Sequence, residues 1–277
     1  QIRALAEHEN SVDAVVENVT IGTLSAIAVG TSADSSVDVS ISVDVNAVSG
    51  FGSATIGDVT VGDITAQASD SVTFTMDVAA EADAGDATIG NVSVGAAEMT
   101  LTSAYNGTGD IDYGVSITAE AVNASDNATA SIASVTIGAI TIDGDIGGNG
   151  VTTYDAHVYA GIDINAFANA HTDKQATAEL QDITIGDVYL SAGTDGELSA
   201  NISIESAVNS NGTATVDRVT IGNIDMVSEM GAGSETVSLG IYVSANSYSS
   251  LGDAAVRTVS IGNINVSSTD DVYEQEV

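Results

Sequence analysis

The chain of 277 residues is 44% apolar and 4% aromatic, and its 39 acidic against 4 basic residues give a formal charge of −35. This charge makes nucleic-acid phosphates and anionic membrane surfaces very poor partners, and it favours cations or a saline medium instead. The chain has no Cys, which excludes disulfides and thiolate metal sites, and it has no run of 18 apolar residues that would cross a membrane.

Residues 1–17 show the least regular pattern of the chain. Ile2 to Glu9 fits either a turn of helix or the frayed start of a strand, and we expect the whole segment to be an irregular N-terminal cap. The first residue is Gln1 rather than Met, which predicts that a leader was removed and that the protein is exported. A chain boundary of another origin would look the same. We therefore expect an extracellular or cell-surface location.

Residues 18–267 contain one motif seven times, as in Thr220-Ile221-Gly222-Asn223-Ile224. Each copy has Ser or Thr, then Ile and Gly, and an apolar residue two places after the Gly. The repeat glycines are Gly22, Gly57, Gly90, Gly138, Gly186, Gly222 and Gly262. Apolar residues alternate on both sides of the Gly but slip by one position across it, which is typical of a β-bulge or a bend. We therefore predict a short strand in each copy that bends at its Gly.

A second kind of segment lies between the copies. In residues 37–47, Val, Ile and Ala alternate with Asp, Ser and Asn, which predicts a long strand with one buried and one solvated face. The pattern returns in five further segments, at 72–80, 113–121, 154–164, 198–204 and 237–245. Linkers rich in Gly, Ser, Asn and Asp absorb the variation in spacing between repeats.

Two one-sided strands per repeat predict an all-β fold in which two layers pack face to face. We expect a two-layer β-solenoid or β-arch stack of about seven repeats, because stacking explains why the Gly recurs at one place in every copy. An antiparallel β-sandwich explains the alternation equally well and is the alternative. No composition break marks a domain boundary, so we expect one domain over 1–277, in which the acidic tail 268–277 covers one open end of the stack.

Catalytic signatures are absent from the sequence. The three histidines, His8, His157 and His171, form no His-Glu-x-x-His motif, and there is no Gly-x-Ser-x-Gly elbow or P-loop lysine. Acidic residues are so numerous that two of them within reach of each other do not by themselves make a site. We therefore expect a protein that is not an enzyme.

Calcium is the best ligand hypothesis, and no other cofactor is indicated. Hard cations take six to eight oxygen ligands, and a stack would align side-chain oxygens near the repeat glycines. The candidate metal ligands are Asp58, Asp63 and Asp187, with Asn91, Asn223 and Asn263 in the position after a repeat Gly. The alternative is a ladder of solvated Asp and Asn side chains.

Asn-x-Ser/Thr sequons occur at eight positions. Four of them fall in or beside linkers, where an exported archaeal or eukaryotic protein would carry glycans: Asn106, Asn123, Asn127 and Asn211.

The composition as a whole, which is Cys-free, aromatic-poor, acidic and rich in Val, Thr, Gly and Ser, resembles that of secreted envelope fibre proteins such as the amyloid-like sheath subunits of methanogenic archaea. The resemblance covers the whole chain and rests on composition and repeat style. It implies a secreted β-solenoid that polymerises with copies of itself. We therefore expect a non-enzymatic extracellular structural protein that assembles into a fibre, sheath or surface layer. The alternative is a repeat segment of a cell-surface adhesin that binds a glycan or surface, with or without calcium.

Overall fold

The computed structural model describes residues 1–7, 12–28, 35–48, 52–101, 109–124, 126–144, 156–171, 173–193, 196–228, 236–267 and 273–276. These residues form strands and turns, and no helix occurs among them. In particular, no described segment is a helix long and apolar enough to cross a membrane.

The strands form three sheets. Sheet A consists of β1 (Ile2–Ala6), β4 (Ser36–Ala47), β7 (Ser71–Ala82), β10 (Gly109–Ala124), β13 (Ala156–Ala170), β16 (Glu197–Val208), β19 (Thr236–Ser247) and β22 (Tyr273–Glu276). Sheet B consists of β2 (Ala14–Ile21), β5 (Ala54–Val61), β8 (Ala87–Val94), β11 (Ala128–Ile137), β14 (Ala176–Ile185), β17 (Gly212–Ile221) and β20 (Asp253–Ile261). Sheet C consists of β3 (Leu24–Ile27), β6 (Ile64–Ala68), β9 (Ala97–Leu101), β12 (Ile140–Gly144), β15 (Val188–Ala192), β18 (Ile224–Ser228) and β21 (Ile264–Ser267).

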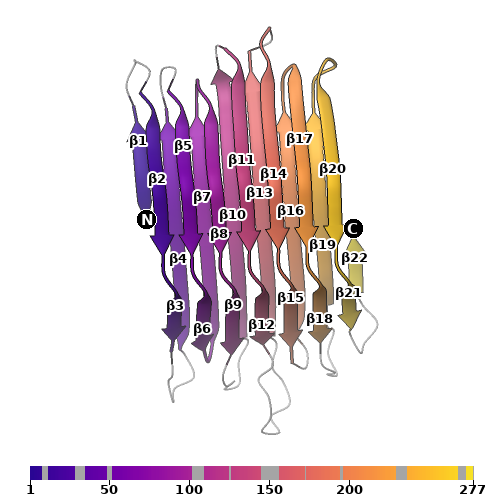
Figure 1. Ribbon diagram of the computed structural model, residues 1–277. Coiled ribbons are helices and arrows are strands. Elements are labelled where there is room, and N and C mark those ends of the chain that lie inside the picture. Colours follow the sequence, from indigo (N-terminus) through magenta and orange to yellow (C-terminus); the bar gives the residue numbers. More distant parts are fainter. Residues whose placement is uncertain are drawn as a thin grey trace.

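The chain winds as a β-solenoid. Each turn, here called a rung, passes once through sheets A, B and C in that order, and the next rung lies beside it (Figure 1). Every strand pairs with the equivalent strand of the neighbouring rung in parallel. The predicted all-β stack of seven repeats is therefore confirmed, and the antiparallel sandwich is wrong. Positions in register along the stack are called a column below.

The bend predicted at the repeat Gly is the corner between sheets B and C. Strand β17 ends at Ile221 and β18 begins at Ile224, so Gly222 and Asn223 make the turn. In this corner column the N–H of each glycine after Gly22 donates to the carbonyl of the residue before the corner glycine one rung earlier, as in Gly222 to Ile185 at 2.9 Å. The short motif thus supplies two strands in two sheets rather than one bent strand in one sheet.

Two of the seven repeat glycines were assigned to the wrong column. Gly57 and Gly90 lie inside β5 and β8, and the corner glycines of those rungs are Gly62 and Gly95, whose N–H groups donate to Ile21 and Val61. The bulge glycines resemble the corner glycines in sequence because the apolar alternation slips twice in each rung. One slip is a bulge within the sheet B strand, and the other, five residues later, is the corner.

The core lies between sheet A on one side and sheets B and C on the other. Valine, isoleucine and alanine fill it, and most of them are fully buried. Where sheet A leads into sheet B, alanine columns from both sheets face the interior, such as Ala82 in β7 and Ala87 in β8. The layers lie close there, because Ser206 Oγ of sheet A donates a 2.8 Å hydrogen bond to the Ala178 carbonyl of sheet B.

Both termini depart from expectation. The segment 1–17 is not an irregular cap, because it contains β1 and the first four residues of β2. The acidic tail is not merely a covering segment either, since Tyr273–Glu276 form β22 and pair with Val237–Gly240. Alternation is hard to recognise in strands of four or five residues, which explains why the sequence pattern did not reveal them.

Candidate functional site

The two ends of the stack expose core-facing residues. At the C-terminal end, Val256 and Val259 occupy the columns of Val216 and Val219. They are 40% and 42% exposed, whereas both residues of the preceding rung are completely buried. Strands β20 and β21 are the last strands of sheets B and C, so their outer backbone N–H and C=O groups face the same open edge.

The N-terminal end is open in the same way. Val16, Ile21, Leu24 and Ala26 lie in core-facing columns of β2 and β3 and are only partly buried. Strands β2 and β3 are the first strands of sheets B and C. Each end therefore presents apolar columns between two sheet edges with which no described strand pairs, which is a surface that another parallel strand layer can extend.

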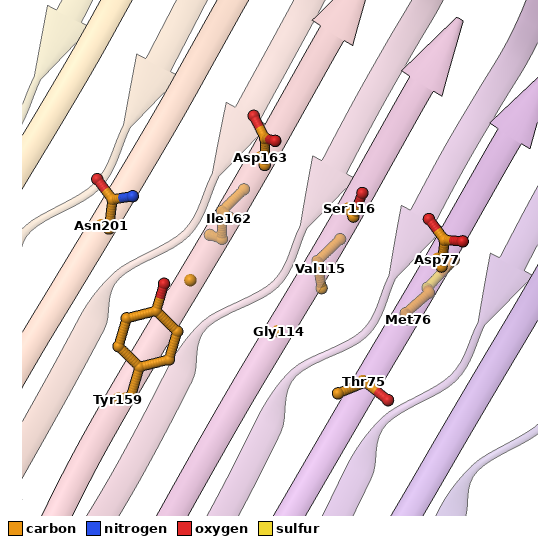
Figure 2. Close-up of a pocket in the computed structure, with 11 residues that line it drawn as sticks. Thr75, Met76, Asp77, Gly114, Val115, Ser116, Tyr159, Ile162, Asp163 and Asn201 are labelled. Carbon is orange, nitrogen blue, oxygen red and sulfur yellow. The ribbon is translucent and has the colours of Figure 1, made fainter.

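A second candidate surface is a hollow of about 290 Å³ on the outer face of sheet A (Figure 2). Gly114 and Gly161 line it and have no side chain to fill it, and Tyr159 lies at one side (Figure 2). The polar lining residues are Thr75, Asp77, Ser116, Asp163 and Asn201. The hollow therefore combines one aromatic ring with carboxylate, hydroxyl and amide groups within a shallow depression.

The position of the tyrosine depends on a glycine. A Cβ added at Gly161 would lie 2.6 Å from Tyr159 Oη, so the ring lies across the space that a side chain would take. At Gly114 the nearest atom to an added Cβ is Thr75 Cγ2 at 3.8 Å, which leaves the floor open. The alternating pattern did not predict this hollow, although glycines at the solvent-facing positions of the long strands are a signal for one.

The three candidate calcium ligands do not meet within one chain. Asp58 lies within β5, whereas Asp63 and Asp187 lie in the corner column, three rungs apart. Three rungs correspond to about 14 Å at the usual strand spacing. The carboxylates instead accept hydrogen bonds from the next rung, as Asp63 Oδ1 does from the backbone N–H of Ala96 at 2.9 Å.

These residues belong to ladders of side chains that run along the stack. Asp187 Oδ1 accepts from the backbone and side-chain nitrogens of Asn223 at 2.7 and 3.1 Å, and Asn223 Oδ1 accepts from those of Asn263 at 3.0 and 3.2 Å. Asp58 accepts from Asn91 in the same manner at 3.2 and 2.8 Å. The ladder alternative thus describes what these side chains do in the single chain.

The linker sequons are only partly described. Asn127 is exposed, and its Oδ1 accepts from the Gln175 backbone N–H at 3.2 Å. Asn211 Oδ1 accepts from Ser249 Oγ at 2.6 Å. Asn106 lies outside the described residues, and of Asn123 only its place in β10 is described. Glycosylation at these four positions stays a prediction.

Carboxylates also gather on the outer face of sheet A. Partial burial, followed by the charges of Glu120, Asp44, Asp83 and Asp77, raises the pKa of Glu81. Its Oε2 accepts a 2.9 Å hydrogen bond from the side chain of Asn46. Negative charge is therefore concentrated along the stack as well as being abundant in the composition.

Comparison of the chain with protein-family models, with curated proteins and with solved structures finds no match. The ends of the stack and the outer faces of its sheets are therefore the features from which a function can be inferred.

Proposed function

We propose that this chain is a non-enzymatic extracellular structural protein whose copies assemble into a fibre, sheath or surface layer. The observation that carries the proposal is the pair of open ends, where the apolar columns and the edges of sheets B and C stop without a covering element among the described residues. Natural β proteins usually cover or blunt such edges, and an edge left open is a template for pairing with another chain. The composition, which resembles that of envelope fibre proteins, supports the same function.

The test is to block the C-terminal end with charge. The double variant Val256→Glu/Val259→Glu places two carboxylates at half-exposed positions of the last rung, where the single chain tolerates them but a dry interface would not. The control, Thr136→Glu/Thr220→Glu, adds the same charge at exposed positions of central strands.

Assembly of the purified chains is followed by light scattering and electron microscopy over a range of salt and calcium concentrations. We expect the wild-type and control chains to form particles and the blocked variant to stay monomeric. A wild-type chain that remains monomeric in every condition would overturn the structural function.

The hollow on sheet A supports a second candidate function, a repeat segment of an adhesin that binds a glycan. An exposed tyrosine face beside hydroxyl, amide and carboxylate groups suits a sugar ring, which has both apolar faces and many hydroxyl groups. Affinity electrophoresis through gels containing soluble neutral polysaccharides tests it. Tyr159→Ala should abolish retardation, and Tyr189→Ala is the control because Tyr189 is 40% exposed against 39% for Tyr159. Equal migration with and without polysaccharide would exclude this function.

A further inference from the structure

Sheet A differs from the other two sheets in its number of strands. Within the described ranges it has eight strands, whereas sheets B and C have seven each. Its first and last strands are short: β1 has 5 residues and β22 has 4, while the six strands between them have 12 to 16. The sheet therefore contains six full rows and two fractions of a row.

The two fractions occupy different parts of the row. Strand β1 pairs with Val43–Ala47, the second half of β4. Strand β22 pairs with Val237–Gly240, which lie in the columns of Val37–Ser40, the first half of β4. In Figure 1, β22 accordingly lies low at one end of the stack and β1 lies high at the other.

We infer that copies stack head to tail and that β22 of one copy and β1 of the next share a single row of sheet A. This inference rests on the proposed assembly and names the surfaces that make it. The shared row lies between β19 of the first copy and β4 of the second. Two columns, those of Ile41 and Ser42, separate the two half-strands, so the two half-strands fit into one row without overlapping. Every sheet then has seven rows per copy.

Sheets B and C continue across the same junction with matched side chains. The core-facing residues of the last rung meet apolar residues of the first rung in every column: Ala254 with Ala14, Val256 with Val16, Val259 with Val19, Ile261 with Ile21, Ile264 with Leu24, and Val266 with Ala26. On the outer face, Arg257 lies at the bulge position that Glu17 occupies in the first rung, so the junction places opposite charges side by side.

Gly22 gives independent support. At the corner glycines of the later rungs an added Cβ would meet the backbone of the preceding rung, as at Gly262, where it would lie 2.7 Å from the Gly222 carbonyl oxygen. Gly22 has no preceding rung, and nothing lies within 4 Å of its added Cβ. The single chain therefore has no steric need for glycine at this position. In the head-to-tail stack, the backbone of Gly262 of the previous copy would lie against position 22 and would leave no room for a side chain there.

The first test is therefore Gly22→Ala. The melting temperature should be equal to or slightly above that of the wild type, because the new methyl group meets open space, whereas the concentration needed for assembly should rise at least about tenfold. Unchanged assembly of this variant would overturn the inference.

The second test uses disulfide cross-linking, for which the absence of native Cys gives a clean background. Chains carrying Thr20→Cys and Ser260→Cys are mixed, because these residues share a column of sheet B. Chains carrying Glu274→Cys and Asp38→Cys are mixed to probe the shared row. Both mixtures should give cross-linked dimers on non-reducing gels.

The matched control pairs Glu274→Cys with Ser42→Cys, which lies four residues further along β4 on the same face, and it should give no dimer. If the wild-type chain forms particles but neither mixture of Cys variants gives its expected cross-link, assembly uses another surface. That result would overturn this inference and leave the proposed function standing. Cross-linking of the control as strongly as of the in-register pair would overturn the shared row.

Discussion

At the scale of the residue, the corner glycines are fixed by close approach between rungs. A Cβ at Gly222 would lie 2.5 Å from Asp187 Oδ1 and 2.7 Å from the Asp187 backbone nitrogen. The side-chain oxygen can move, but the backbone nitrogen belongs to a paired rung and cannot. Stacking parallel turns at strand spacing thus leaves no room for a side chain that points along the stack at this corner.

We expect Gly222→Val to lower the free energy of unfolding by about 1–3 kcal/mol, because the rungs must separate locally to admit the side chain. Gly114→Ala is the matched control on an open outer face, where the nearest atom is 3.8 Å away. It should raise stability by roughly 0.4–1 kcal/mol through the lower entropy of the unfolded chain. Chemical denaturation of both variants measures these changes, and equal stability of Gly222→Val and the wild type would contradict the close-approach argument.

At the scale of the element, the long strands of sheet A were readable from sequence because one face is buried and the other is wet. The corner was readable in five rungs, since Ser or Thr, Ile and Gly stand at the end of the sheet B strand there. In the other two rungs Val61-Gly62 and Val94-Gly95 hold the corner, and the similar sequence Ile56-Gly57 lies at the bulge. Only the hydrogen-bond partner of the glycine distinguishes these two slips.

The candidate sites were less predictable, because they depend on register between rungs. Asp63 and Asp187 lie three rungs apart in the corner, whereas Asp58 lies within β5, because the motif copy at Gly57 marks the bulge and not the corner. The hollow requires that Tyr159 lie across Gly161, a side-chain placement that no sequence pattern specifies. The complementarity of β1 and β22 depends on their alignment to β4. Strand β1 pairs with β4 directly, whereas β22 is connected to it through six successive strand pairings.

The carboxylates on sheet A predict a dependence of stability on pH. Because the pKa of Glu81 is raised in the folded chain, mainly by burial, the folded state holds this proton more tightly than the unfolded state. The stability gained from protonated Glu81 is therefore fully present below the ordinary pKa of 4.5. It is lost as the pH rises through the raised pKa of the folded chain.

The Glu81→Gln variant should accordingly show a smaller drop in melting temperature than the wild type when the pH rises from below 4.5 to 7. Glu179→Gln removes the same charge from sheet B and serves as the control. Parallel melting curves of wild type and Glu81→Gln over this range would contradict the assignment.

At the scale of the whole molecule, the proposed assembly would bring chains of formal charge −35 into contact. The Debye length at physiological salt is about 8 Å. Charges on neighbouring strands lie closer together than this, so salt screens their repulsion only in part. We therefore expect assembly of the purified chain to need millimolar Ca²⁺ or Mg²⁺, or salt well above physiological concentration.

Light scattering in titrations of NaCl, with and without EDTA, measures this requirement. Ca²⁺ that acts at millimolar concentration, where NaCl at equal ionic strength fails, would indicate cations bridging carboxylates between copies. Assembly that proceeds equally well in EDTA at low salt would contradict the electrostatic argument.

Seven rungs at the usual strand spacing of ~4.8 Å also fix how much charge the polymer carries per unit length. A copy advances the stack by about 34 Å, so a formal charge of −35 amounts to roughly one elementary charge per ångström. B-DNA carries one per ~1.7 Å and already condenses a layer of counterions around itself. A stack of these chains would then be a polyelectrolyte of higher linear charge density than DNA. A layer of condensed cations would surround it, in addition to any cations bound at specific sites. Uptake of cations into that layer accompanies each added copy, so the logarithm of the elongation equilibrium constant should increase linearly with the logarithm of the salt concentration.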